Sequence, residues 1–384
     1  MKRVHRFRCW WPGLLAVLLV GCWDAKELEQ VIYINALGFD YQKDVYSAYA
    51  QVINFANLGK TTTGTRTPEE VWVGRGYGHT VDSSTDNLFL TVQQRISWAH
   101  IKGVLLSERV LQHGRYDQLF DAYVRYPEIR FEQSLFATRD SIEQVLTATP
   151  LLHISSLYTR FINPHDTYNQ NSDVAPISLR EFIKRLEEPS CTIVLPYLKV
   201  NDTRWRRNMK DHRVMEADGV GFIKNKKYKG TLEPDQVKGL RWVQKESIRS
   251  TVCLFEGKKA VASLSLIKPD RKTTFRMQDG KPRFTVTIKA AGKLVESLEY
   301  KSEHQLTALA AQQVEKEVRE LFLEGVKMQT DVLGLEETLY RAEPKLWQRL
   351  TQGQDLVLEK QTLEKIDVKV SLRGTGKLQM KTNL

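Results

Sequence analysis

The stretch SEHQLTALAAQQVEKEVRELFLEGVKM, residues 302–328, decides the fold more than any other part of the chain. Ser302 and Gln305 have the spacing of a capping box, in which each side chain accepts a hydrogen bond from the other residue's backbone, so a helix is predicted over 303–328. At 1.5 Å per residue this helix is about 40 Å long. Its apolar residues recur on one face, which we interpret as core packing against a sheet. They are Leu306, Leu309, Ala310, Val314, Val318, Leu321 and Phe322.

The sequence on both sides of this helix has the pattern of strands. Short apolar or alternating runs precede it at 283–290 and 293–299, and IDVKVSL follows at 366–372. Farther upstream, strand and helix patterns mix without the steady alternation typical of a parallel α/β sheet. Helices are predicted there at 84–96, at 117–125, and after Ser141 and Ser178. The predicted fold class is therefore α+β, with several domains that each pack helices on a mixed or antiparallel sheet.

The chain is too long for one typical domain of about 100–200 residues, because it has 384. Residues 22–200 are predicted to form an N-terminal α+β region, either one unit or two subdomains that divide near 140–165. The charged run NDTRWRRNMKDHRVMEA at 201–217 is interpreted as a linker. Residues 218–384 then form a C-terminal α+β domain that contains the long helix.

The N-terminus has the pattern of a secretory signal peptide. Four basic residues and no acidic ones lie in 1–12, and the uncharged run GLLAVLLVG follows at 13–21. That run is too short to cross a bilayer, which takes about 20 apolar residues. The junction Leu19-Val20-Gly21-Cys22 resembles the bacterial lipobox, so residues 1–21 are expected to be removed between Gly21 and Cys22 and the Cys22 thiol to carry a diacylglyceryl lipid. Two acyl chains give stable anchoring at a bilayer surface.

Composition narrows the possible partners. The formal net charge is +11, and it falls to +7 once the four basic residues of 1–21 are removed. This basicity suits an anionic lipid surface, and no pattern of a nucleic-acid-binding motif accompanies it, so no nucleic acid is expected. Cys191 and Cys253 are the cysteines left beside Cys22, and two free thiols are favoured over a disulfide.

No complete catalytic or metal-binding motif is found. Gly74, Gly76 and Gly78 form GxGxG, but HTVDSSTD follows where a dinucleotide site needs a helix, so a glycine-rich turn is favoured. The histidines, among them His100, His153 and His165, do not have the spacing of metal ligands. The sequence therefore predicts no catalytic residue, no metal and no cofactor.

Motifs spaced along the chain resemble one known family. Gly21-Cys22-Trp23-Asp24 is similar to the start of the mature Ger(x)C proteins, and His100 with IKGVLLSE is similar to their central segment. Residues 125–130, RYPEIR, resemble the family's Arg-Asp-Pro-Glu-Ile-Arg around Pro127, with Tyr126 where Asp is usual. Near the end, Leu372-Arg373-Gly374 departs from the family at Gly374, which replaces a basic residue. Positions after the long helix also match, namely Gln329, Asp331, Gly334 and Trp347.

The resemblance implies a function. Ger(x)C proteins are the lipoprotein C subunits of spore nutrient germinant receptors, they are not enzymes, and their fold is a set of three α+β domains. The resemblance implies integral-membrane A and B subunits as partners and a place on the outer face of the inner spore membrane. Two alternatives are a solute-binding lipoprotein of a transporter, which usually has two lobes of regular βα alternation, and a membrane-anchored hydrolase, which needs a nucleophile motif that the sequence lacks.

Overall fold

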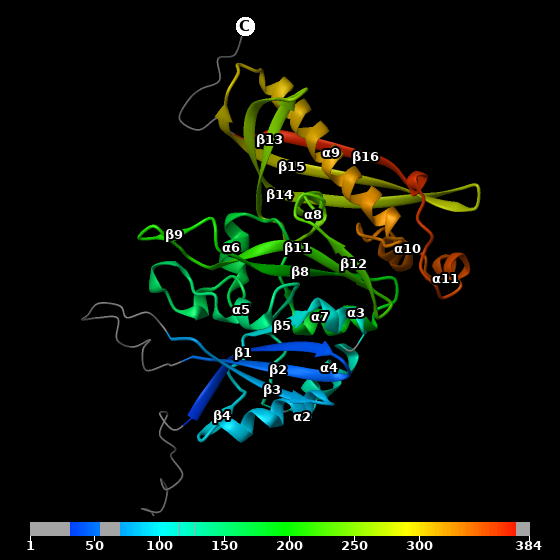
Figure 1. Ribbon diagram of the computed structural model, residues 1–384. Helices are drawn as coiled ribbons and strands as arrows, with labels where there is room; N and C mark the ends of the chain where they lie inside the picture. The colour runs from blue at the N-terminus through cyan, green and yellow to red at the C-terminus, as the bar shows by residue number, and fades with distance from the viewer. Residues whose placement is uncertain (1–30, 54–69, 115, 127, 374–384) are drawn as a thin grey trace, which may run out of the picture.

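The computed structural model describes residues 31–53, 70–114, 116–126 and 128–373 (Figure 1). The expected signal peptide at 1–21, the lipobox residues Gly21 and Cys22, and the family-like positions Trp23, Asp24 and Pro127 lie outside the described residues. The remaining family-like positions, His100, Gln329, Asp331 and Trp347, lie within them.

The first part of the structure is built on a ten-stranded mixed sheet with the order β12-β11-β8-β6-β5-β1-β2-β3, to which β4 and β7 add at β1 and β6. The central pairs β1/β5, β5/β6 and β6/β8 are parallel and the outer ones are antiparallel. The strands are β1 (Val31–Gln42), β2 (Val45–Val52), β3 (Trp72–Gly78), β4 (Arg95–Ser97), β5 (Gly103–Ser107), β6 (Ser134–Thr138), β7 (Ile177–Ser178), β8 (Thr192–Asn201), β11 (Val214–Lys224) and β12 (Lys227–Leu232).

Helices cover both faces of this sheet, as parallel central strands require. The side chains of α2, α3, α4 and α7 share one apolar cluster, and those of α5 share the other with Phe161. The central strand β5 is accordingly buried along its whole length. The helices are α2 (Val81–Asp86), η3 (Asn87–Thr91), α3 (Glu108–Gln112), α4 (Tyr116–Val124), α5 (Ile142–Thr147), η4 (Leu151–His153), η5 (Ser156–Tyr158), α6 (Pro164–Gln170) and α7 (Leu179–Glu187).

The second part is a four-stranded sheet with the order β13-β14-β15-β16, on which the long helix α9 lies (Figure 1). The last pair, β15/β16, is parallel. A parallel pair needs a long crossover, and the helical segment between these strands supplies it. The strands are β13 (Arg249–Glu256), β14 (Lys259–Gln278), β15 (Lys281–Ser297) and β16 (Leu363–Leu372); the helices are α8 (Leu240–Val243), α9 (Glu303–Lys327), α10 (Leu335–Ala342), α11 (Pro344–Thr351) and η6 (Lys360–Thr362).

The prediction for helix α9 is confirmed. Ser302 and Gln305 form the capping box, and an N-cap of this kind contributes about 1 kcal/mol. The apolar face packs into one cluster with the inner face of the four-stranded sheet. Burying each large aliphatic side chain contributes roughly 1.5–3 kcal/mol, so packing outweighs the cap. The stripe residues Leu306, Ala310, Val314, Val318, Leu321 and Phe322 are all buried there.

The α+β class is confirmed, but the arrangement of the parts differs from the sequence-based expectation. The run 201–217 is not a plain linker: β9 (Arg206–Arg207) and β10 (Lys210–Asp211) form a hairpin, and β11 begins at Val214. Strand β11 pairs with both β8 and β12, so the ten-stranded sheet continues past residue 217 to Leu232. The run is charged because the hairpin side chains face solvent.

The expected division near 140–165 is not seen in the strand order either. Strand β6 precedes that stretch and β8 follows it, yet the two strands pair within one sheet. The described strands accordingly form two large sheets and one short hairpin, where the family resemblance implied three sheet-based domains. The expectation that residues 218–384 form a domain of their own stays a prediction.

Candidate functional site

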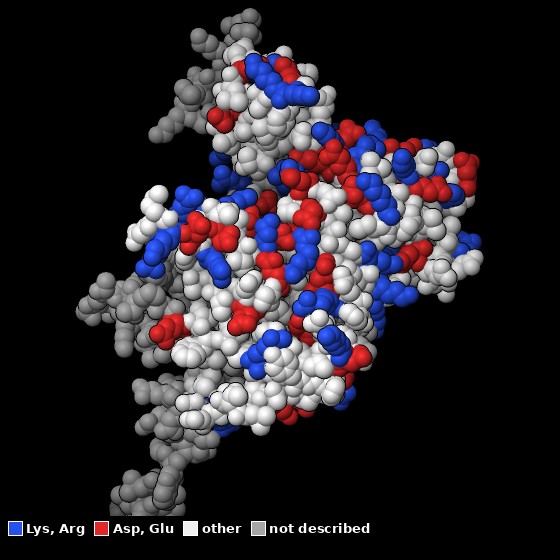
Figure 2. Space-filling model, viewed as in Figure 1, with Lys and Arg blue, Asp and Glu red and all other residues white. Residues whose placement is uncertain are grey.

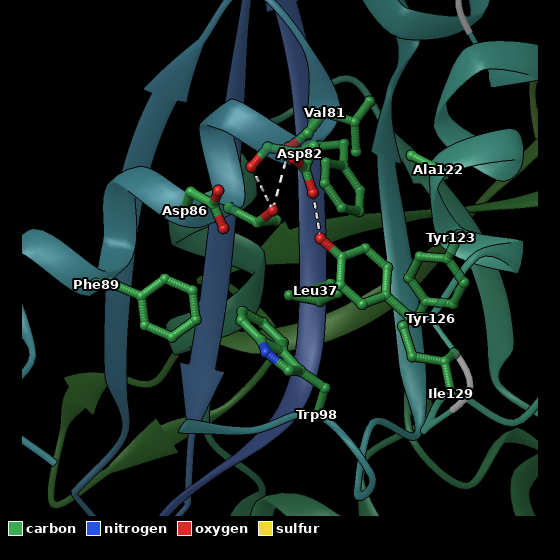
Figure 3. A pocket seen from close by; sticks show the side chains of 12 residues that line it. Leu37, Val81, Asp82, Asp86, Phe89, Trp98, Ala122, Tyr123, Tyr126 and Ile129 are labelled. Atoms are coloured by element: carbon green, nitrogen blue, oxygen red, sulfur yellow. Dashed lines mark hydrogen bonds between the residues drawn. The ribbon is translucent and has the colours of Figure 1, made fainter. Parts of the chain in front are cut away.

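An open pocket with a volume of about 70 Å³ lies between β1, the α2–η3 segment, the turn after β4, and α4 with the turn that follows it (Figure 3). Apolar side chains line its interior, among them Leu37, Val81 and Ile129. Aromatic side chains line it as well, among them those of Phe89, Trp98 and Tyr126. Mostly apolar walls with a few polar groups are typical of small-molecule sites.

Glycines in β3 allow α2 to approach the sheet at this pocket. A Cβ atom at Gly76 would lie 2.2 Å from the backbone oxygen of Ser84, and one at Gly78 would lie 2.5 Å from the backbone nitrogen of Ser84. Thr80 then caps α2 in a capping box with Ser83. The GxGxG pattern is therefore not a turn but the strand β3, whose glycines make room for the helix above it.

The predicted helix at 84–96 is replaced by three shorter elements. Helix α2 ends at Asp86, the 3₁₀ segment η3 follows, and β4 then pairs with β1. Leu88 points into the core, whereas the ring of Phe89 is 46% exposed and forms a T-shaped pair with Trp98 at 6.2 Å between centroids. The break in the helix thus places an aromatic side chain at the pocket and not in the core.

The charged groups of the pocket are acidic. The hydroxyl of Tyr126 donates a hydrogen bond to the Asp82 carboxylate (Figure 3), and this bond raises the pKa of Tyr126 to about 12. Asp86 lies one helical turn after Asp82, and its side chain has no hydrogen bond or ion pair among the described residues. Of the residues that the structure describes, no lysine, arginine or histidine lines the pocket. Tyr126, the departure from the family pattern, is therefore a residue of this site.

His100 lies close in sequence to the pocket residue Trp98 but does not line the pocket. Its exposed ring makes a T-shaped contact with Tyr33, with 4.9 Å between the ring centroids.

Two of the other three family-like positions, Asp331 and Trp347, lie at a buried junction around Glu336, a residue that the sequence did not single out. Both oxygens of the Asp331 carboxylate accept backbone N–H bonds, from Leu333 at 3.2 Å and from Glu336 at 2.7 Å, and so hold the start of α10. The indole N–H of Trp347 donates to Glu336 Oε1 at 2.9 Å. Gln329 lies farther out, where its amide donates to the carbonyl oxygens of Val326 and Leu358.

The Glu336 carboxylate also pairs with Lys224, and both side chains are 1% exposed. Glu336 Oε2 accepts a further bond from the Leu356 backbone at 3.1 Å. Burial raises the pKa of Glu336 above its ordinary value, and the Lys224 ammonium opposes that rise. Lys224 ends β11 in the ten-stranded sheet and Glu336 belongs to α10, so this pair joins the two parts of the protein. No local sequence pattern links residues 112 positions apart.

The two cysteines in the described part of the chain are free thiols, as the sequence favoured. Burial raises the pKa of Cys191 to about 11, so this thiol stays protonated and unreactive at neutral pH. Among the described residues, no three histidine, cysteine or acidic side chains gather as a metal site would require. No helix in the same ranges is long and apolar enough to span a membrane.

Charges of both signs intermingle over the face shown in Figure 2. No extended basic surface of the kind that follows a nucleic-acid backbone is visible on this face. At the lower end of the view, where α2 and β3 lie, uncharged side chains predominate. This is the end of the molecule that carries the aromatic pocket.

Comparison with known proteins identifies the class. A model described as "Spore germination protein N-terminal domain" matches residues 24–200, and one described as "Spore germination B3/ GerAC like, C-terminal" matches 218–376. The chain is 25% identical to spore germination protein KC of Bacillus subtilis (strain 168), with 94% of each chain covered. It is 23% identical to spore germination protein B3 of the same organism, over 98% of this chain and 99% of that protein.

The fold has a counterpart in a solved structure. The crystal structure of the GerBC protein superposes with a TM-score of 0.52 at 17% sequence identity, and the match covers 88% of this chain and 96% of that one. Fold and matched domains together define a spore germination protein of the GerAC type. The chain belongs to the Ger(x)C family, the C subunits of germinant receptors.

Proposed function

We propose that this protein is a membrane-anchored subunit of a spore germinant receptor, required for the response to nutrients, and that it acts by docking to the integral-membrane A and B subunits. The observation that carries the proposal is the match of both family domains, in order, over 24–200 and 218–376. Relatives that align over nearly their full length are spore germination proteins. Because the match extends over both domains, the proposal covers the whole chain.

The anchor in this proposal is a lipid on Cys22, after removal of 1–21. Eight residues, 23–30, separate Cys22 from Val31, the first residue of β1, and the nine steps along an extended chain span at most about 30 Å. The folded part then stays close to the outer face of the inner spore membrane, where a short tether raises its effective concentration toward membrane partners. The net charge of +7 after removal of 1–21 adds attraction to anionic lipid.

The alternatives fit the fold less well. A solute-binding lipoprotein of a transporter usually has two lobes with regular βα alternation, whereas this chain has a ten-stranded mixed sheet and a four-stranded sheet. A membrane-anchored hydrolase needs a nucleophile with a base in reach, and His100 faces Tyr33. We therefore propose a non-enzymatic role without a cofactor.

The anchor is tested by replacing the acylated thiol. Cys22→Ala is expected to yield a precursor that keeps residues 1–21 and gains no lipid, because the thiol is the acylated atom. Mass spectrometry of the membrane fraction measures both changes. Cys253→Ser, which changes a thiol within the fold, is the matched control and should be processed normally. Normal acylation of the Cys22→Ala chain contradicts the proposed anchor.

The receptor role is tested in spores. Deletion of the protein should abolish germination by one class of nutrient and leave nutrient-independent germination intact. Cys22→Ala should weaken the same response through lower local concentration. If a deletion strain without other receptors of overlapping specificity responds normally to a full nutrient panel, the proposed role is wrong.

A further inference from the structure

The aromatic pocket has the chemistry of a site for a positively charged group. The rings of Phe89, Trp98 and Tyr126 lie together on one side of the carboxylates of Asp82 and Asp86 (Figure 3). The face of an aromatic ring is electronegative and attracts a cation within about 6 Å of its centre. Rings that gather around a hollow are the usual means of holding an alkylated ammonium group.

The carboxylates add a second, independent attraction. Asp82 and Asp86 are four residues apart on α2, so their like charges face the same side and destabilise the helix slightly when no cation lies between them. Asp82 already accepts the Tyr126 hydroxyl, which leaves Asp86 without a partner among the described residues. The described residues that line the pocket therefore include two negative charges and no positive one.

A second hollow lies beside the pocket, and its charges do not cancel the negative charge of Asp82 and Asp86. It shares the three rings with the pocket and adds Arg95 and Glu128, whose charges are opposite. The negative charge of the pocket thus remains local to the α2 side. An anion would be repelled there, and a neutral apolar molecule would leave the Asp86 carboxylate without a partner.

We propose that this pocket binds a small organic cation, an ammonium group carried on a short apolar body. The head lies between the rings and the two carboxylates, and the apolar body contacts Leu37, Val81 and Ile129. This ligand site goes beyond the receptor role, and it is measured on the purified protein, so either proposal can fail without the other.

The first test compares cations with neutral molecules of the same shape. Calorimetric titration of the full chain, purified in detergent, uses choline against 3,3-dimethylbutan-1-ol and n-butylammonium against butan-1-ol. At least one cation is expected to bind saturably with one site per chain, and its neutral counterpart at least tenfold more weakly, which corresponds to about 1.4 kcal/mol. If neither cation binds, or if the neutral molecules bind as tightly, the proposal is wrong.

The second test locates the site. Asp82→Asn combined with Asp86→Asn removes both charges at almost constant shape and should weaken cation binding at least tenfold. Asp279→Asn, in the turn between β14 and β15 of the other sheet, is the matched control and should leave binding unchanged. Asp86→Asn alone breaks no contact among the described residues, so it repeats the test if the double variant folds poorly. Unchanged affinity in these pocket variants places the cation elsewhere and overturns the proposal.

Discussion

The Lys224–Glu336 junction and the aromatic pocket both contain acidic side chains, yet they are opposite in construction. At the junction, both oxygens of the Glu336 carboxylate are bonded, and the ion pair is closed off from water. At the pocket, Asp86 has no partner among the described residues, and the aromatic ring of Phe89 is 46% exposed. A buried charge must be fully paired or the fold is lost, whereas an open site can leave its charges for a ligand.

This difference assigns separate roles to the two regions. The junction joins the ten-stranded sheet to α10, so its bonds maintain the orientation of the two parts. The pocket lies within the first part and shares Leu37, Val81 and Ile129 with its core, whereas the carboxylates of Asp82 and Asp86 lie outside that core. Substitutions at the junction should therefore change stability, and substitutions at the pocket should change binding.

The largest effect is expected from Lys224→Met. It leaves the Glu336 carboxylate buried without its cation, which typically costs about 3–5 kcal/mol. Thermal and urea unfolding measure the loss. Lys227→Met, at an exposed lysine three residues away, is the control and should change little. Adding Glu336→Gln to Lys224→Met removes the unpaired charge and should recover most of the loss; a Lys224→Met protein as stable as the control contradicts the assigned role of the junction.

A smaller loss is expected from Trp347→Phe. The ring is largely kept, but Glu336 Oε1 loses its 2.9 Å bond from the indole, and a hydrogen bond to a charged group contributes about 1.5–3 kcal/mol. The midpoint of urea unfolding measures this change. Trp205→Phe, at an exposed tryptophan of the 201–217 segment, is the matched control. Equal midpoints for the two variants would show that the Trp347 bond contributes nothing.

The smallest change in stability is expected from Asp86→Asn. The side chain is exposed and breaks no contact among the described residues, and the substitution relieves repulsion from Asp82, so the free energy of unfolding should stay within about 0.5 kcal/mol. Thermal unfolding without added cation measures it. A loss of more than about 2 kcal/mol would mean that the pocket, like the junction, supports the fold.

The sequence by itself determined the features that depend on neighbours along the chain. Helix α9 could be located from Ser302 and from its apolar stripe, because capping and helical periodicity act over three or four residues. The same capping pattern predicted helix α7 after Ser178, whose side chain accepts a hydrogen bond from the backbone N–H of Glu181. The spaced motifs also identified the family, and the domain matches confirm it.

Tertiary structure decided how distant segments meet. The pairing of β8 with β11 across 201–217 follows from strand register, which no local pattern specifies. The apolar positions at 84–96 fitted a helix, but the close approach of α2 to Gly76 and the pairing of β4 with β1 divided that stretch. Lys224 and Glu336 likewise come together only when both sheets are in place. Long-range contacts of this kind depend on the whole folded chain, and they formed both the junction and the pocket.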